Sequence, residues 1–494
     1  MTSSPSARQQ TPRSRIALLF LLLPALLTAM DISILFVASP AVTEALEPTA
    51  TQWLWMMDVY GFVMAGLLIT MGGLGDRFGR RRLLLLGSVL FGLASAGITL
   101  AASPAAFIAA RALLGVGAAT LAPSTLSLIR GIFSDDRRRR AAVGAWTVAF
   151  TSGSIVGPII GGALLEQFWW GSVFLINIPV MLLLLATVPF LVPESERSES
   201  TGFDVPGAVI SLVAIVSSVY AVKHLVEHGV DGRFTVTALV GAVGLWQFVR
   251  RQRRASHPLV DLALFRVPAF GAAIGSVTAV AFAAAGLGLL TFTFMQTVHG
   301  LSPLEAALWA LPAIAGSLLG ATAASVLPLR PAVGVGAGLA IVAAGFAVVG
   351  SVGPEASLFR VIAGYTLLSL GVSAVGTLAN ALVLGTAPLE RAGAAAGVSE
   401  TSQELGAALG IAALGTIATA VFESGYDGSA ETVAGVESEA ANLPAAAADE
   451  LVGAASAAFT DGFTVAALTG AAIVCACAIA AVPLLRHRDR DPEP

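Results

Sequence analysis

The sequence predicts an all-α protein that crosses a membrane many times. Of its 494 residues, 56% are hydrophobic and only 12% are charged, and the mean hydropathy is +0.84. Soluble domains carry about 25% charged residues, so this composition excludes an ordinary soluble protein. The chain also holds a series of long apolar runs, and its basic residues collect in alternate connections between those runs. These observations together indicate a polytopic membrane protein.

Each apolar run is long enough for a membrane helix, because crossing ~30 Å of hydrocarbon takes roughly 20 residues. The first run contains Asp31 and is too long for a cleaved signal peptide, so it counts as a span. The fourteen predicted spans lie near residues 16–37, 52–74, 83–102, 105–129, 141–165, 170–192, 204–223, 233–250, 268–297, 303–327, 331–351, 357–386, 393–421 and 460–485.

The order of the spans suggests two six-helix bundles joined by an inserted helix pair. The predicted units are 1–195, 196–266 and 267–494, and transporters are often built from such repeated halves around a central site. An acidic segment at about 423–459 precedes the last span. It is interpreted as a solvated outside loop with some helix, or alternatively as a helical hairpin that caps the outer mouth of a pathway.

The basic residues test this count. If the N-terminus is cytoplasmic, 23 of the 27 lysines and arginines fall on inside segments, as the positive-inside rule requires. Lys223, Arg233 and Arg360 fall outside, and Arg111 lies within a span. Removing one span from the count would exchange inside and outside for every later connection, and the basic residues there would then fall outside. We therefore expect a multi-pass protein of the plasma membrane with both termini cytoplasmic, and the arginine- and alanine-rich composition suggests a bacterial source.

Two short stretches are rich in glycine. In "MGGLGDRFGRRR" (71–82), glycines permit close helix approach and a tight turn, and Asp76 can accept hydrogen bonds from a helix N-terminus or pair with an arginine. Such a contact can form in one rocking state and break in the other; a plain positive-inside turn is the alternative. In "GSIVGPIIGG" (153–162), glycines one turn apart allow close helix packing and Pro158 permits a kink. Any tightly packed helix crossing could share the second pattern.

Charged residues inside the spans are the strongest functional candidates, because a charge at the bilayer centre costs ~2.5–3.5 kcal/mol on insertion scales. Asp31, Asp58 and Arg111 all lie roughly 9–14 Å below the outer surface by helical rise, so they can form one cluster. Two acids against one arginine leave one acid without a full partner, and desolvation favours its protonated form. The alternative is a purely structural ion cluster.

Further candidates lie on other spans. Glu400 and Glu404 share one face of the thirteenth span, where their mutual repulsion also favours protonation. Tyr60 and Trp309 offer aromatic faces for cation–π contact, with interfacial anchoring as the alternative. We expect no metal site. The sequence contains no phosphate-binding loop and no nucleophile turn, so we expect no enzyme activity, no cofactor and no nucleic-acid partner, and energy from an ion gradient.

These motifs resemble those of a known family. The first stretch is similar to the G-x-L-x-D-R-x-G-R-R signature of the major facilitator superfamily, a conformational latch that would fall here on Gly72, Asp76, Arg77, Gly79 and Arg80. The second resembles the antiporter motif of its exporters, carried by Gly153, Gly157, Pro158, Gly161 and Gly162. "RALLGVGA" resembles the fourth-helix motif through Arg111, Gly115, Gly117 and Ala118, although Leu114 replaces a common glutamine.

Asp31 in "MDISILFVASP" and Asp58 in "QWLWMMDVYGF" resemble the two aspartates of the fourteen-helix drug:proton antiporters, above all the quaternary-ammonium and dye exporters. Glu400 matches an acidic residue of these exporters and therefore ranks above Glu404. Ser317 stands where some of them carry an extra aspartate, which argues against recognition of divalent cations.

The resemblance implies a major facilitator fold and proton-coupled export of lipophilic, mainly cationic compounds by alternating access. Asp31, Asp58, Arg111 and Glu400 would couple protons, and Asp31, Asp58, Tyr60, Trp309, Glu400 and Glu404 would bind substrate. The protein would act as a monomer among membrane lipids. The alternatives are an exporter of one physiological solute, such as an amino acid, lipid precursor or siderophore, and a non-transporting membrane receptor.

Overall fold

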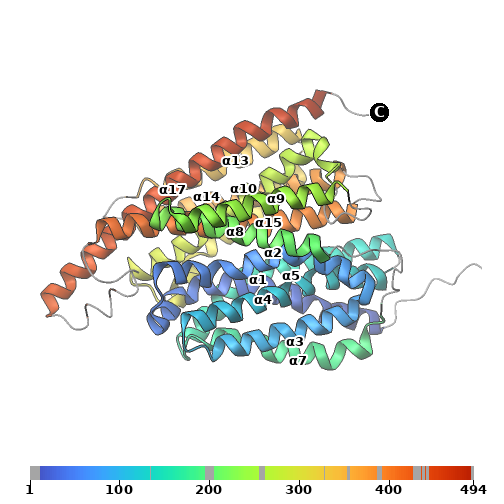
Figure 1. Ribbon diagram of the computed structural model, residues 1–494, viewed down its shortest axis with the longest axis horizontal. Coiled ribbons are helices and arrows are strands. Elements are labelled where there is room, and N and C mark those ends of the chain that lie inside the picture. The colour runs from blue at the N-terminus through green and yellow to red at the C-terminus, as the bar shows by residue number, and fades with distance from the viewer. Residues whose placement is uncertain are drawn as a thin grey trace, which may run out of the picture.

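The computed structural model describes residues 12–133, 135–194, 205–254, 262–327, 329–352, 357–386, 392–426, 436, 440 and 444–490. Within these residues the chain is almost entirely helical and contains no strand, and the long helices run nearly parallel to one another (Figure 1). The all-α prediction is confirmed.

The helices fall into three groups along the chain. The first comprises α1 (Pro12–Leu46), α2 (Ala50–Phe78), α3 (Arg80–Thr99), α4 (Pro104–Ile132), α5 (Asp136–Leu165), α6 (Ser172–Leu175) and α7 (Asn177–Leu191). The second is the pair α8 (Val205–His228) and α9 (Gly232–Gln252). After the 3-10 turn η1 (Leu264–Arg266), the third comprises α10 (Pro268–Thr297), α11 (Pro303–Trp309), α12 (Leu311–Val326), α13 (Pro331–Val349), α14 (Leu358–Thr386), α15 (Ala392–Gly425) and α17 (Ala445–Arg490).

Several helices begin at residues that satisfy free backbone amides. Thr49 and Ser302 each form a capping box, with Gln52 at the start of α2 and Glu305 at the start of α11. Ser103 accepts the amide of Ala106 and is followed by Pro104, whose fixed φ suits the first helical position. Polar caps at the ends and apolar residues between them define the spans.

The two halves repeat one packing order. α1 packs on α5, α2 on α4, and α3 on both α4 and α7; in the second half α10 packs on α15, α12 on α14, and α13 on both α14 and α17. Each half has a hydrophobic core, and the core of the first half continues into α10, α11, α14 and α15 of the second. The halves meet where α2 packs along α15, where α1 meets α10 and where α5 meets α11.

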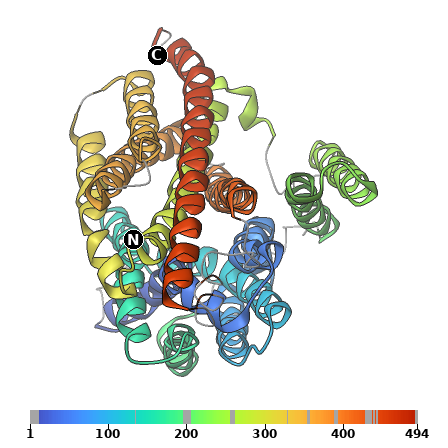
Figure 2. The same ribbon diagram turned by 90° about the vertical axis from the view of Figure 1, so that its left-hand side faces the viewer.

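The inserted pair lies at the edge of the molecule, as Figure 2 shows. α8 contacts both α2 and α15, whereas α9 packs mainly on α8. The close α8–α9 contact uses small residues, with Gly241 against Ser218 and Gly244 against Ala214. The pair therefore touches both halves through α8.

All fourteen predicted spans coincide with helices, although two of them are broken. Twelve stretches of the described residues are long and apolar enough to cross a membrane. α2 and α8, with 29 and 24 residues, have sufficient length, and for these two membrane crossing stays a prediction. The sixth span is divided at Ile176 and the tenth at Ala310, just before Pro312, whose missing amide hydrogen favours a helix start.

Several predicted boundaries are wrong. α1 continues to Leu46 instead of residue 37, and only Gly79 separates α2 from α3. The acidic segment at 423–459 was expected to be a loop with some helix or a helical hairpin; 423–425 end α15 and 445–459 form the start of α17, which has 46 residues. This stretch is rich in alanine, the strongest helix former, and it belongs to the candidate membrane span Ala446–Arg486. Val436 and Ala440 of the same segment are buried, and the other residues from 427 to 443 lie outside the described part.

Candidate functional site

Asp31, Arg111 and Asn177 form a buried polar network inside the N-terminal half. Arg111 Nη1 on α4 donates a hydrogen bond of 2.6 Å to Asp31 Oδ2 on α1, and the two side chains are 2% and 0% exposed. Asn177 Nδ2, at the start of α7, donates to Asp31 Oδ1 at 3.4 Å and to Ser95 Oγ at 3.1 Å. The network ties four helices together around one carboxylate.

Tyr60 covers this network from α2. The guanidinium carbon of Arg111 lies 4.7 Å from the centroid of the Tyr60 ring, within cation–π range. The Tyr60 hydroxyl is buried without a hydrogen-bond partner among the described residues. Asp58, two residues earlier on α2, is also buried, at 1% exposure. The predicted cluster of Asp31, Asp58 and Arg111 thus contains a direct Asp31–Arg111 ion pair.

A cavity of about 360 Å³ lies between the two halves. Such a volume is within the range of small-molecule sites. Its described polar lining residues are Ser33, Ser154, Ser317, Ser369, Ser373, Gln403 and Glu404, and its aromatic ones are Phe36, Phe150, Phe292 and Tyr365. They come from α1, α5, α10, α12, α14 and α15, so both halves contribute to the wall.

Glu404 is the one carboxylate among the described residues that line this cavity. Glu400, which the sequence ranked higher, is half-buried one turn away and is not part of the described lining. The structure therefore reverses that ranking for contact with the cavity. Ile32 and Ser33, which follow Asp31 on α1, line the cavity, so the buried network lies next to the cavity wall.

Trp309 does not line the cavity. It ends α11 with 44% of its surface exposed, which suits a residue that contacts lipid or the membrane interface. Tyr60 is also absent from the described lining, because its ring faces Arg111. Both aromatic side chains proposed for substrate contact therefore lie elsewhere, and Phe36, Phe150, Phe292 and Tyr365 take that place.

The glycines of 153–162 bring α5 into direct contact with neighbouring backbones. A Cβ on Gly153 would collide with the Leu26 carbonyl of α1, and one on Gly157 would lie 2.9 Å from the Met30 carbonyl. Gly161 faces Ile34 of α1, and a Cβ on Gly162 would lie 2.7 Å from the Leu304 backbone of α11. α5 passes through Pro158 as one continuous helix, and Pro158 lines the cavity.

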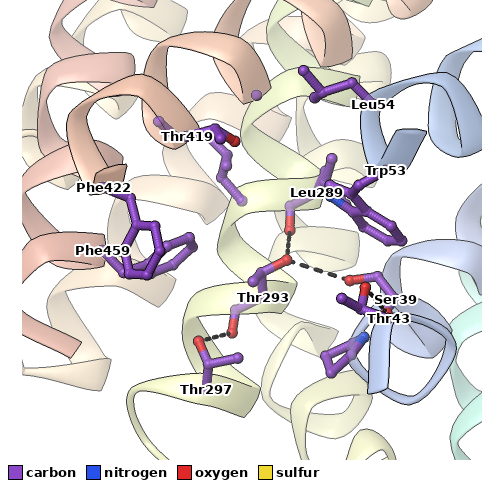
Figure 3. Close-up of a pocket in the computed structure, with 14 residues that line it drawn as sticks. Ser39, Thr43, Trp53, Leu54, Leu289, Thr293, Thr297, Thr419, Phe422 and Phe459 are labelled. Carbon is purple, nitrogen blue, oxygen red and sulfur yellow. Dashed lines mark hydrogen bonds between the residues drawn. The ribbon is translucent and has the colours of Figure 1, made fainter. Parts of the chain in front are cut away.

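The halves contact each other at the ends of the helices predicted to be outside. Ser39 Oγ of α1 lies 3.5 Å from Thr293 Oγ1 of α10, and Ser302 Oγ donates to Glu166 Oε1 at 3.2 Å. A small pocket of about 70 Å³ lies here between Trp53, Thr419, Phe422 and Phe459, as Figure 3 shows. Hydroxyl groups and aromatic rings thus close this end of the interface.

The stretch predicted to be a latch forms a tight glycine turn, and its role as a latch stays a prediction. Gly79 adopts a φ of +103°, a conformation that favours glycine, and forms the whole turn between α2 and α3. Gly72 faces open space, so it is not needed for close packing in this structure. Arg77 is exposed, Arg80 Nη1 donates to the Pro123 carbonyl at 3.5 Å, and the side chain of Asp76 lies outside the described residues.

Glu194 is a partner of this turn that the sequence did not reveal. The Arg81 amide donates to Glu194 Oε1 at 2.9 Å, and Glu194 Oε2 lies 3.7 Å from Arg81 Nε and 3.8 Å from Arg82 Nε. Arg81 Nη1 also donates to the carbonyls of Pro189 and Val192 at 3.1 Å, at the end of α7. The turn is therefore fixed to α7 of its own half. The acidic residue of "VPES", which follows an apolar run, could have indicated this contact, because a carboxylate is favoured near the N-terminus of a helix.

Comparison with known proteins agrees with this architecture. Residues 21–411 match the Major Facilitator Superfamily. The chain is 41% identical over 493 residues to the multidrug efflux pump LfrA of Mycolicibacterium smegmatis, covering 96% of this chain and 97% of LfrA. It is 35% identical over 419 residues to the methyl viologen resistance protein SmvA of Salmonella typhimurium, covering 83% and 84%.

The fold is also similar to that of solved structures. A bacterial homolog of the human lysosomal transporter Spinster aligns with a TM-score of 0.67 at 18% identity, over 98% of this chain and all of that one. The repeated halves, the family match and the relatives together show that this chain belongs to the Major Facilitator Superfamily of membrane transporters.

Proposed function

We propose that the protein is a proton-coupled multidrug exporter that moves lipophilic, mainly cationic compounds out of a bacterial cell by alternating access. The observation that carries the proposal is the cavity between the halves, with one carboxylate, Glu404, among aromatic side chains. A carboxylate and aromatic faces in an apolar wall favour a lipophilic cation. Relatives support the drug class: LfrA is named a multidrug efflux pump, and SmvA is named for resistance to methyl viologen, an organic cation.

In this scheme Glu404 meets the cation directly. The hydroxyl groups of Ser317, Ser369 and Ser373 line the cavity and give polar groups of varied compounds a choice of partners. Few fixed polar contacts and many apolar ones suit a broad substrate range, because no single hydrogen-bond pattern is demanded.

Asp31 serves the proton. Its carboxylate is held behind the cavity wall by Arg111 and Asn177, so protonation breaks a buried charge pair and releases Arg111. Removing one charge of such a pair is costly in a dry interior, which couples the protonation state to the arrangement of α1, α4 and α7. Asp58, also buried on α2, is a second proton-binding candidate.

Alternating access requires the outer contacts to open. The contacts between Ser39 and Thr293 and between Ser302 and Glu166 join the halves in this structure, so we assign it to a state closed at the predicted outer end. Protonation from outside and release of the cation would accompany their separation. The protein would act as a monomer in the plasma membrane, with both termini cytoplasmic and without a cofactor.

The proposal is tested by dye efflux from cells with and without an uncoupler, followed by proton release from everted vesicles on addition of a cationic drug. We expect the uncoupler to abolish efflux. We expect Asp31→Asn to abolish drug-induced proton release in preparations that contain as much folded protein, by size-exclusion chromatography, as the wild type. Asp449→Asn, on the exposed start of α17, is the matched control and should leave exchange unchanged. Efflux that persists with the gradient collapsed, or normal exchange in Asp31→Asn, would contradict the coupling. Resistance profiling with cations and neutral compounds separates a multidrug pump from a carrier of one solute.

A further inference from the structure

The turn between α8 and α9 departs from the charge pattern of the rest of the chain. Of the three basic residues predicted to lie outside, Lys223 and Arg233 flank this one turn, and Arg360 lies far away in the sequence. Basic residues are disfavoured on the outside unless something there needs them. The membrane topology therefore does not explain why basic residues lie at this turn.

A groove of about 440 Å³ opens between the two helices next to this turn. Its described lining residues are Val216, Ser217 and Tyr220 of α8 and Gly232, Arg233, Val236 and Thr237 of α9. The Tyr220 ring is held in place between Trp55 at 6.1 Å and His224 at 5.8 Å. The Thr237 hydroxyl donates hydrogen bonds to the carbonyls of Arg233 and Phe234 in its own helix. What remains is a mainly apolar wall with a guanidinium at the end nearest the turn.

The guanidinium of Arg233 is exposed and has no ion pair with any residue whose position is described. The acid nearest in sequence, Asp231, is already engaged: it accepts the Phe234 amide at 2.7 Å and lies 2.8 Å from His224 Nε2. The Phe234 amide and His224 also hold the pKa of Asp231 below its usual value, so this carboxylate stays ionised and satisfied. Arg360, by contrast, donates to the Ser351 carbonyl at 3.3 Å.

We propose that the groove between α8 and α9 binds an anionic phospholipid, with the phosphate on Arg233 and one acyl chain along Val216, Tyr220 and Val236. In the predicted topology the groove lies at the outer end of two membrane helices, where lipid chains and their phosphate groups are available. The lipid fills the side of α9 that other helices leave open, because α9 packs mainly on α8. It thereby supports the pair that contacts both halves through α8.

The test uses the full chain in nanodiscs that contain phosphatidylglycerol and phosphatidylcholine, with retained lipid counted by native mass spectrometry after transfer to detergent. We expect the wild type to retain phosphatidylglycerol preferentially and Arg233→Ala to lose this retention about fivefold, as for one basic residue at an anionic surface. Arg360→Ala is the matched control and should retain lipid like the wild type. Inorganic phosphate should not displace the lipid, because the acyl chain contributes to binding.

A second variant tests the groove itself. Val236→Trp keeps Arg233 but fills the space between the helices, so it should lose the lipid as Arg233→Ala does, while eluting as a monodisperse protein. Unchanged retention in either variant, equal loss in Arg360→Ala, or displacement by inorganic phosphate would overturn the proposal. None of these outcomes depends on whether the protein transports drugs.

Discussion

Arg111 Nη1 lies 2.6 Å from Asp31 Oδ2 between α4 and α1, and both side chains are almost completely enclosed. Asp31→Asn should therefore destabilise the protein by about 3–5 kcal/mol, because it leaves the guanidinium buried without its counter-charge. Thermal unfolding in detergent, followed by size-exclusion chromatography, measures the loss. Arg111→Gln added to Asp31→Asn removes the orphaned charge, so the double variant should be more stable than Asp31→Asn alone. Strictly additive losses would contradict a direct pair.

Glu404 and Glu400 provide a matched comparison on one helix. Glu404→Gln should weaken transport of a monovalent cationic dye roughly tenfold in apparent affinity, about 1.4 kcal/mol, because it removes the described carboxylate of the cavity wall. Transport of a neutral compound should change little. Glu400→Gln should have the smaller effect in the same vesicle assay. A larger effect of Glu400→Gln would restore the ranking that the sequence favoured.

Much of the fold could be predicted from the sequence. Membrane helices need long apolar runs, and the arginines gather at the predicted cytoplasmic ends of those helices and so indicate the direction of each one. Helix ends could not be predicted, since the start of α17 depends on alanine propensity beyond the apolar stretch and α1 continues through Pro40. For the site, helical rise correctly placed Asp31 near Arg111, because both belong to one half. The residues of the cavity wall depend on how the two halves face each other, and the spacing of residues within one helix does not determine this. For that reason Glu404 was ranked low, and Tyr365 and Phe36 were missed.

Two glycines of α5 should respond to substitution by alanine with changes in stability of opposite sign. Gly157→Ala should destabilise the protein, because its Cβ would press on the Met30 carbonyl and the Ser33 side chain of α1. Gly144→Ala, in the same helix but facing open space, should instead stabilise by about 0.5–1 kcal/mol through helix propensity. Thermal unfolding of both variants decides the matter. A loss of similar size at Gly144 would indicate that backbone flexibility, and not contact with α1, explains the motif.

The contact between Ser39 and Thr293 can be converted into a covalent lock. In a background with Cys475→Ser and Cys477→Ser, the pair Ser39→Cys and Thr293→Cys should form a disulfide on mild oxidation. Dye efflux should then stop, because the halves cannot separate at this end, and a reductant should restore it. Each single cysteine variant serves as the control. Full efflux by the cross-linked protein would show that this end does not open during transport.

Ser317 limits the charge of the cavity wall. It lies on α12 within hydrogen-bond distance of Ser373 of α14, at a position where Ser317→Asp would add a second carboxylate facing the cavity. We expect this variant to improve resistance to divalent organic cations relative to monovalent ones. Ser325→Asp, exposed further along the same helix, is the matched control and should leave the ratio unchanged. An equal change in both variants would point to a general charge effect.

The 46 residues of α17 extend over ~69 Å at 1.5 Å per residue, more than twice the ~30 Å thickness of the hydrocarbon. In Figure 1 the beginning of this helix projects beyond its neighbours. The later portion of α17 packs against α13. A rotation of the second half therefore displaces the beginning of α17 further than it displaces the residues packed on α13. A spectroscopic label near Ala446 would thus convert a small tilt in the bilayer into a large displacement in water, where it is easily recorded.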